Sequence, residues 1–255
     1  MAVWAVADLH LSFGVPNKKM DVFGAQWQNH TEKLERNWKN HIHNDDLVLL
    51  PGDISWAMRL EEVVPDFEWI HHLPGTKVML RGNHDYWWTS LSRVEKILPS
   101  SIHLIQNNVF NWKNVSVGGA RLWDSPEYQF SDCIDYQENP RAKVSLEESP
   151  AGIDPSETEK IFVRELGRLE MSVKSLSPNA QTKIVMTHYP PIGLDLKDSR
   201  ASRIIEKSGA TICVFGHLHN VRRNFSLFGE TRGVRYALTA CDYLDFMPLK
   251  LLDSP

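Results

Sequence analysis

The sequence predicts an α/β fold, and two features of the chain lead to that prediction. Short apolar runs rich in Val, Ile and Leu recur along its 255 residues, and amphipathic segments of helical length separate most of them. Such runs are typical of strands that are buried on both faces of a sheet. Strands that alternate with helices are typical of an α/β architecture.

The individual elements follow from the same patterns. Strands are expected at 3–7, 47–50, 77–80, 183–186 and 211–215, with further short strands at 102–105, 109–112, 115–117 and 235–239. Helices are expected at 27–43, 60–71, 89–98, 155–175 and 200–208, where apolar residues recur at helical spacing. The sequence therefore predicts strands and helices along most of the chain.

Length and composition favour one domain that spans residues 1–255. Hydrophobic residues make up 42% of the chain, which is enough for a large core without a structural disulfide. The segment 122–154 has no clear period and contains Pro126, Pro140 and Pro150, so it is interpreted as a lid or an insertion. The net charge of -4 gives none of the basic excess that is typical of nucleic-acid-binding proteins.

Cysteine usage and hydropathy predict a cytoplasmic protein without a membrane span. Cys133, Cys213 and Cys241 lie far apart and form no CxxC motif, a pattern that fits a reducing compartment. Apolar stretches fall short of the ~20 residues that a spanning helix needs. The apolar N-terminus lacks the basic region of a signal peptide, so it is interpreted as a first strand.

Polar clusters with the side chains of metal ligands follow five of the predicted strands. They are Asp8-Leu9-His10, Gly52-Asp53, Gly82-Asn83-His84-Asp85, His188 and Gly216-His217-Leu218-His219. Taken alone, a Gly-Asp pair is usually a turn and a single histidine is more often structural. Ligands of α/β sheets, however, collect outside the carboxyl ends of the strands, so five clusters in that position indicate one shared site.

The ordered set of these five motifs resembles the calcineurin-like metallophosphoesterases. The resemblance runs from Asp8 to His219 and implies a four-layer α-β-β-α sandwich, in which two mixed sheets are flanked by helices. It also implies a dinuclear metal site at the strand ends.

The resemblance assigns a role to each matching position. It implies that Asp8, His10 and His219 bind a first metal, that Asn83, His188 and His217 bind a second, and that Asp53 bridges both. His84 is expected to contact the phosphate and assist the leaving group, and Asp85 to orient or charge-tune His84. Two divalent or trivalent ions are expected, with Mn, Fe or Zn favoured, because imidazole and oxygen ligands disfavour soft metals and four imidazoles disfavour Mg²⁺.

The residues around Asp53 distinguish between branches of the family. Gly52-Asp53-Ile54-Ser55-Trp56 lacks the second Asp and the Arg of the GDxxDRG motif, which disfavours a protein phosphatase. The opening Asp8-Leu9-His10 is more similar to bacterial phosphodiesterase and pyrophosphohydrolase branches. The activity implied is hydrolysis of a phosphomonoester or phosphodiester by attack of a metal-bound hydroxide on phosphorus.

Two alternatives of other classes remain open. One is a nuclease, because the first motif also resembles that of SbcD-type nucleases, although the net acidity disfavours a nucleic-acid substrate. The other is a catalytically silent binding scaffold, for which a missing ligand would be the usual sign. A small phosphorylated substrate is the favoured partner, and the sequence leaves the oligomeric state open. Trp56, Trp87, Trp88 and Trp123 lie near the motifs and either line a pocket or pack the loops.

Overall fold

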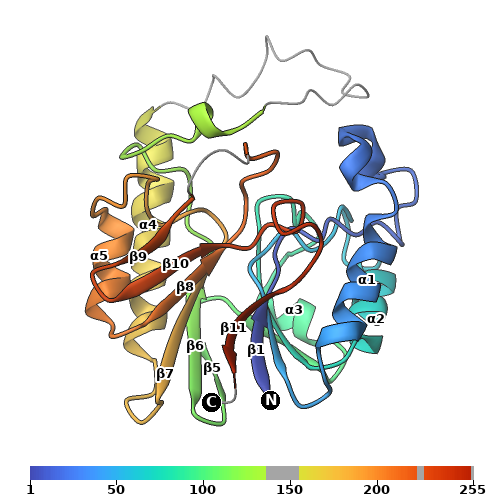
Figure 1. The fold of residues 1–255 in the computed structure, drawn as a ribbon, viewed down its shortest axis with the longest axis horizontal. Coiled ribbons are helices and arrows are strands. Elements are labelled where there is room, and N and C mark those ends of the chain that lie inside the picture. Colours follow the sequence, from blue (N-terminus) through green and yellow to red (C-terminus); the bar gives the residue numbers. More distant parts are fainter. Residues whose placement is uncertain (136–154, 223–226, 254–255) are drawn as a thin grey trace.

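A computed structural model shows two mixed β-sheets packed face to face, with helices on both outer faces (Figure 1). The structure describes residues 1–135, 155–222 and 227–253. The predicted α/β class and the four-layer α-β-β-α arrangement implied by the family resemblance are therefore confirmed. Within the described residues, no helix is long and apolar enough to cross a membrane.

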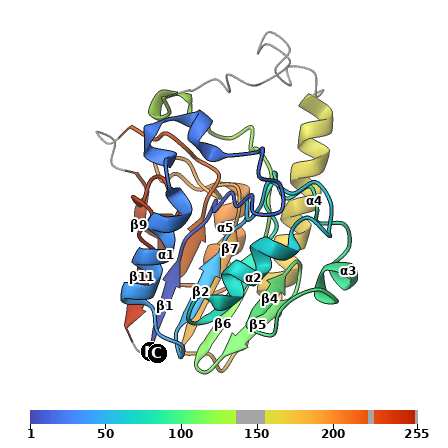
Figure 2. The ribbon, with the colours of Figure 1, turned by 90° about the vertical axis from the view of Figure 1, so that its right-hand side faces the viewer.

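The first sheet has five strands, and four of them are parallel. Its order is β11-β1-β2-β3-β4, and β11 pairs antiparallel with β1. The bounds are β1 Ala2–Ala5, β2 Leu47–Leu50, β3 Thr76–Leu80, β4 Ile102–Ile105 and β11 Leu249–Asp253. Helices α1 (His30–His41), α2 (Val64–His72) and α3 (Leu91–Glu95) cover its outer face (Figure 2).

The second sheet has six strands in the order β5-β6-β7-β8-β10-β9. Its four central strands are parallel, and the two edge strands are antiparallel to their neighbours. The bounds are β5 Val109–Trp112, β6 Val115–Ala120, β7 Thr182–Thr187, β8 Ile212–Phe215, β9 Gly229–Thr231 and β10 Val234–Leu238. Helices α4 (Pro155–Lys174) and α5 (Arg200–Lys207) cover its outer face (Figure 1).

Alternate side chains of each central strand enter different cores. Val3, Leu47 and Leu49 point into the core between the two sheets, where they meet Ile184 and Val214 of the second sheet. Their neighbours on the same strands, such as Val48 and Leu50, pack under α1 and α2 instead. This period of two explains why the runs are apolar throughout, since both faces of the strands are buried.

The sequence predicted most of these elements, with a few differences. The predicted bounds of β2, β4 and β5 match the structure, whereas the first helix begins at His30, because Ala25–Trp27 forms a separate 3-10 turn, η2. Strands β9 and β11 were missed, since β9 has three residues and β11 is a short segment of three leucines, a lysine and an aspartate without a regular period. Of the proposed lid at 122–154, residues 122–135 form loops and a 3-10 turn, η3 (Ser131–Cys133), and 136–154 lie outside the described residues.

The buried carboxylate of Asp46 ties β1 to the segment that leads into β2. Its Oδ1 accepts a hydrogen bond from the Ala2 amide (2.6 Å), and its Oδ2 accepts from Trp4 Nε1 (3.1 Å) and the His43 amide (2.9 Å). Buried donors that lose such a partner are costly, because water does not replace it.

We therefore expect Asp46→Ala to lower the free energy of unfolding by about 2–4 kcal/mol, because three donors lose their acceptor. Urea denaturation followed by circular dichroism measures this loss. Asp45→Ala is the matched control, since Asp45 is the exposed neighbour, and its expected change is within about 0.5 kcal/mol. Equal effects of the two substitutions would contradict the stabilising role of the Asp46 carboxylate.

Candidate metal centre

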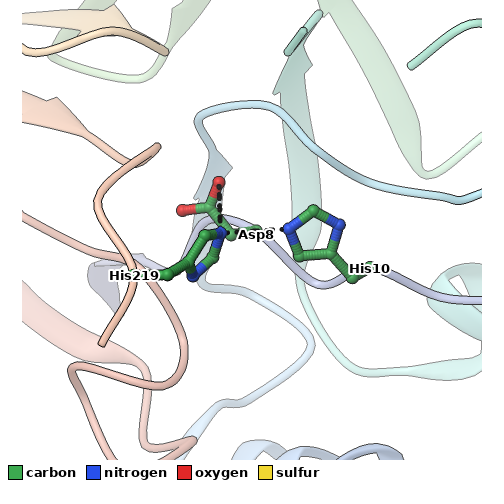
Figure 3. A group of neighbouring side chains, drawn as sticks. All are labelled: Asp8, His10 and His219. Atoms are coloured by element: carbon green, nitrogen blue, oxygen red, sulfur yellow. Dashed lines mark hydrogen bonds and ion pairs between the residues drawn. The ribbon is translucent and has the colours of Figure 1, made fainter. Parts of the chain in front are cut away.

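The first group of predicted ligands meets above the carboxyl ends of β1 and β8. Figure 3 shows the carboxylate of Asp8 and the rings of His10 and His219 pointing toward one another. The Nε2 atoms of His10 and His219 are 3.1 Å apart, and His219 Nε2 lies 3.9 Å from Asp8 Oδ1. One donor atom from each of the three residues therefore reaches a common point at which a cation could sit.

The convergence of Asp8 and His10 depends on an unusual backbone. Both residues are left-handed, with φ of 60° and 45°. Their amides are fixed by the next loop, since Asp8 donates to the Gly52 carbonyl and His10 to the Asp53 carbonyl, each at 3.0 Å. Each left-handed residue costs about 1–2 kcal/mol, a strain that is common at functional sites.

The second group brings together Asn83, His188 and His217, which follow β3, β7 and β8. Asn83 Oδ1 lies 2.6 Å from His188 Nε2 and 3.0 Å from His217 Nδ1. The other nitrogen of His188, Nδ1, lies 3.0 Å from the Pro51 carbonyl, which fixes the ring so that Nε2 faces the site. One donor atom from each of these three side chains therefore lies near a second common position, at which another cation could sit.

The Asp53 carboxylate lies between the two groups. Its Oδ2 is 3.8 Å from His10 Nε2, and its Oδ1 is 3.6 Å from His188 Nε2. Oδ1 also accepts a hydrogen bond from the His84 amide at 2.8 Å. A carboxylate with one oxygen toward each group is suited to bridge two cations.

Unpaired buried atoms test whether the residues fit a metal. Within the described residues, Asp53 Oδ2 and His10 Nδ1 are buried side-chain atoms with no hydrogen-bond partner. A buried carboxylate oxygen without a donor or a cation is expensive, because it has lost its water. The orphaned oxygen of Asp53, which lies 3.8 Å from His10 Nε2, therefore fits a bound cation.

The protonation of the ligands supports the same conclusion. Burial raises the pKa of Asp8 well above its usual value and also raises the pKa of Asp53, because both carboxylates are removed from water. Burial lowers the pKa of His188 to about 3 and that of His10 well below its usual value. These imidazoles are neutral, and the neutral ring is the form that binds a metal.

Two glycines make the space in which the carboxylates lie. A Cβ atom on Gly82 would lie 2.0 Å from Asp53 Oδ1, and one on Gly216 would lie 2.3 Å from Asp8 Oδ2. No side chain fits at either position, so the Gly in the Gly-Asn-His-Asp and Gly-His-Leu-His motifs serves the close approach of backbone to carboxylate.

The predicted catalytic histidine, His84, borders the site. Its ring lies 5.7 Å from that of His10 and 4.7 Å from that of Trp56, measured between centroids. Its Nδ1 is buried and has no partner within the described part of the chain. Burial lowers the pKa of His84, although the Asp53 carboxylate counteracts this shift. The ring is thus close enough to act on a group bound at the centre.

Asp85 is expected to orient or charge-tune His84, and the contacts of its carboxylate are with the backbone of two loops and with Trp87. Its Oδ1 accepts from the amides of Ile54 (2.9 Å) and Ser55 (3.2 Å) and from Trp87 Nε1 (3.1 Å). Its Oδ2 accepts from the Gly82 amide at 2.7 Å. Burial raises the pKa of Asp85 to about 7. The carboxylate clamps the loop after β2 to the loop after β3, and it thereby places Asp53 and Asn83.

Asp242 belongs to the site and was missed by the sequence analysis. Its Oδ1 lies 2.9 Å from His219 Nδ1, and its Oδ2 accepts from the Asn220 amide at 2.9 Å. Although burial lowers the pKa of His219, the Asp242 carboxylate raises it to about 9. Asp242 follows β10, so the strand-end rule that found the other residues could have found it too.

Comparisons with known proteins identify the family of the chain. A family model described as calcineurin-like phosphoesterase matches residues 1–221. A comparison with the curated proteins gives no match. Among solved structures, the chain is similar to the phosphopantetheinyl hydrolase of Mycobacterium tuberculosis, with a TM-score of 0.51, 14% identity, and coverage of 100% of this chain and 96% of the other. It is also similar to a protein of unknown function from Aquifex aeolicus, with a TM-score of 0.47, 13% identity, and coverage of 98% and 95%.

The close approach at Gly82 generates a test of the metal centre. Because a methyl group there collides with Asp53 Oδ1, we expect Gly82→Ala to displace the carboxylate and weaken Mn²⁺ binding by about tenfold or more. Isothermal titration measures the affinity. Gly167→Ala on α4, where a Cβ meets nothing within 4 Å, is the control and should bind Mn²⁺ as the unmodified protein does. Unchanged binding by a folded Gly82→Ala variant would contradict the assignment of Asp53.

The pairing of Asp242 with His219 generates a test in metal-free protein. The folded pKa of His219, about 9, lies above its ordinary value of 6.5, so the contribution of the pair to the free energy of unfolding is complete below about pH 6.5 and is lost as the pH rises through 9. We expect Asp242→Asn to destabilise the protein by about 2 kcal/mol at pH 6 and by much less at pH 10.

Denaturation curves in the presence of a chelator, taken from pH 6 to pH 10, measure this difference. Asp195→Asn serves as the control, because Asp195 is an exposed carboxylate paired with Lys197. A constant gap between the unmodified protein and Asp242→Asn across this range would rule out the proposed pairing of His219.

Proposed function

The chain belongs to the calcineurin-like phosphoesterase family, and from this premise we propose that it hydrolyses a phosphomonoester or phosphodiester with the help of two bound metal ions. The observation that carries the proposal is the position of the Asp53 carboxylate, with one oxygen toward each of two separate groups of donors. A single structural ion would need four ligands and no shared carboxylate.

The proposal divides the predicted ligands between two ions. Asp8, His10 and His219 would hold one, and Asn83, His188 and His217 the other, with Asp53 common to both. Nitrogen and oxygen donors without thiolate favour Mn, Fe or Zn. When bound, such a pair supplies Lewis acidity that activates a water and neutralises the charge of the phosphate.

In this proposal His84 acts on the phosphoryl group. His84 lines the pocket beside the centre, where its ring would donate a hydrogen bond to a phosphate oxygen or a proton to the departing alkoxide. The backbone of His84 is fixed by its amide bond to Asp53 Oδ1, which couples the position of the acid to that of the shared ligand. Asp85 holds both loops in place without touching the substrate.

The cysteines and the net charge support proposals about the compartment of the protein and about its substrate. All three cysteines are free and buried, which supports the proposal of a cytoplasmic protein, although burial alone also protects thiols. We favour a small phosphorylated molecule as the substrate, because the net charge of -4 supports no extended contact with a polyanion.

Two substitutions separate metal binding from turnover. With Mn²⁺ present, we expect the protein to release p-nitrophenol from p-nitrophenyl phosphate or its bis ester, and a chelator to abolish the release. We expect His84→Ala to keep both metals and lose about 10²–10⁴-fold in kcat, the range of a lost general acid. Asp53→Ala, in contrast, is expected to lose both metal and turnover. Elemental analysis of the purified protein measures the metal content.

His43→Ala is the matched control, because the His43 side chain is exposed and lies outside the site. It should retain full metal content and full activity. Loss of metal from His84→Ala would show that His84 is a ligand and overturn its assigned role. Inertness of the metal-loaded protein toward both esters would count against the proposed function itself.

A further inference from the structure

A cavity of about 350 Å³ opens directly onto the candidate metal centre. It is lined by His10, Met20, Phe23, Trp27, Trp56, His84, Ile134, His217, His219 and Asn220. Four of these ten residues are histidines of the centre. The rest of the wall comes from the 3-10 turns η1 (Met20–Phe23) and η2, from the residue after η3, and from the loops after β2 and β8. A phosphoryl group bound at the centre therefore has this cavity beside it.

Trp56 forms the part of the wall that contacts His10 and His84. Its ring is stacked on that of His10, with centroids 4.9 Å apart and planes 23° apart. Its Nε1 already donates to Met20 Sδ at 3.0 Å, so the rest of the indole is an apolar surface. Such a surface, adjacent to a predicted ligand, is suited to a planar group carried by the substrate.

The ring of Phe23 lies next to that of Trp56 and is nearly parallel to it. Its ring plane lies 11° from that of Trp56, with the centroids 6.5 Å apart. A planar group aligned with one ring is therefore aligned with the other as well. Trp27 and Met20 are buried behind them, and a hydrogen bond from Gln26 Nε2 to Asn220 Oδ1 (2.7 Å) joins η2 to the loop after β8. The wall is thus fixed from both sides.

The charge of the lining restricts what the cavity can accept. None of its ten residues is Lys, Arg, Asp or Glu, and the polar side-chain atoms are those of the histidines, Asn220 and the indole N–H groups of Trp27 and Trp56. A second phosphate or a carboxylate on the part of the wall away from the centre would find no Lys or Arg there, and a buried charge without such a partner is costly. An uncharged ring gains from burial against Trp56, Phe23 and Ile134.

We propose that this cavity holds the alcohol portion of the substrate, and that the substrate is a phosphoester of an uncharged alcohol bearing a planar or aromatic ring. The inference rests on the proposed phosphoesterase activity and specifies its substrate class. A polynucleotide or a multiply phosphorylated sugar would place charge against this apolar wall and is disfavoured. The cavity volume lies at the lower end of the range for small-molecule sites, which suits a single ring system.

Matched esters test the proposal, because benzyl and ethyl alkoxides are leaving groups of similar basicity. We expect kcat/KM for benzyl phosphate to exceed that for ethyl phosphate by about tenfold or more, and the same preference in the corresponding methyl diesters. Phe23→Ala should reduce the preference for the benzyl over the ethyl ester at least fivefold, because it removes one of the two rings that the planar group would contact. Phe110→Ala is the control, because Phe110 lies on edge strand β5 and stacks on His103. This variant should keep the preference for the benzyl ester.

A binding measurement separates this inference from the proposed function. Titration of the Mn²⁺-loaded protein with benzylphosphonate and ethylphosphonate should show about tenfold tighter binding of the benzyl compound, with loss of the difference in Phe23→Ala. Hydrolysis of both esters at equal rates, or equal binding of both phosphonates, would overturn the assignment of the cavity. Binding of the phosphonates without hydrolysis of any ester would count against the proposed function and leave the cavity assigned as a ring-binding site.

Discussion

The buried Asp53 carboxylate is the constraint on which the rest of the site depends. It lies among histidines and a second buried carboxylate, and one of its oxygens has no hydrogen-bond donor within the described residues. Gly82 leaves it room, the His84 amide fixes its other oxygen, and Asp85 holds the two loops that meet around it. A positive charge at this place would turn a costly arrangement into a stable one, because buried carboxylates need paired charge.

The centre exists only where the two sheets meet. Loops after β1, β2 and β3 of the first sheet bring Asp8, Asp53 and Asn83, and loops after β7 and β8 of the second bring His188 and His217. A parallel bridge between Ala7 and Ala240, with the Ala7 amide donating to the Thr239 carbonyl at 2.7 Å, joins the sheets at this end. The inter-sheet core therefore sets distances between donors that come from separate halves of the fold.

The sequence indicated the strands and the location of the site better than the details of its construction. Apolar runs buried on both faces are easily recognised, and the polar residues that follow them include all seven proposed ligands. The stacking of two sheets came from the family resemblance, since periodicity within a strand carries no information about which strands pair. The left-handed backbone at Asp8 and His10, and the loop contacts of Asp85, depend on hydrogen bonds between segments far apart in the chain. Asp242 is a different case, because it follows β10 and the rule that polar residues after a strand end collect at the site could have found it.

The turns η1 and η2, which form one wall of the cavity at the centre, contribute none of the seven proposed ligands. Residues in these turns can therefore be exchanged over evolutionary time while the ions stay bound. Relatives with the same set of donors would then diverge in the molecules they accept through changes in a short stretch near the N-terminus. The family motifs alone are consequently a poor guide to what each member acts on, and the segment 20–27 is where such divergence should be sought.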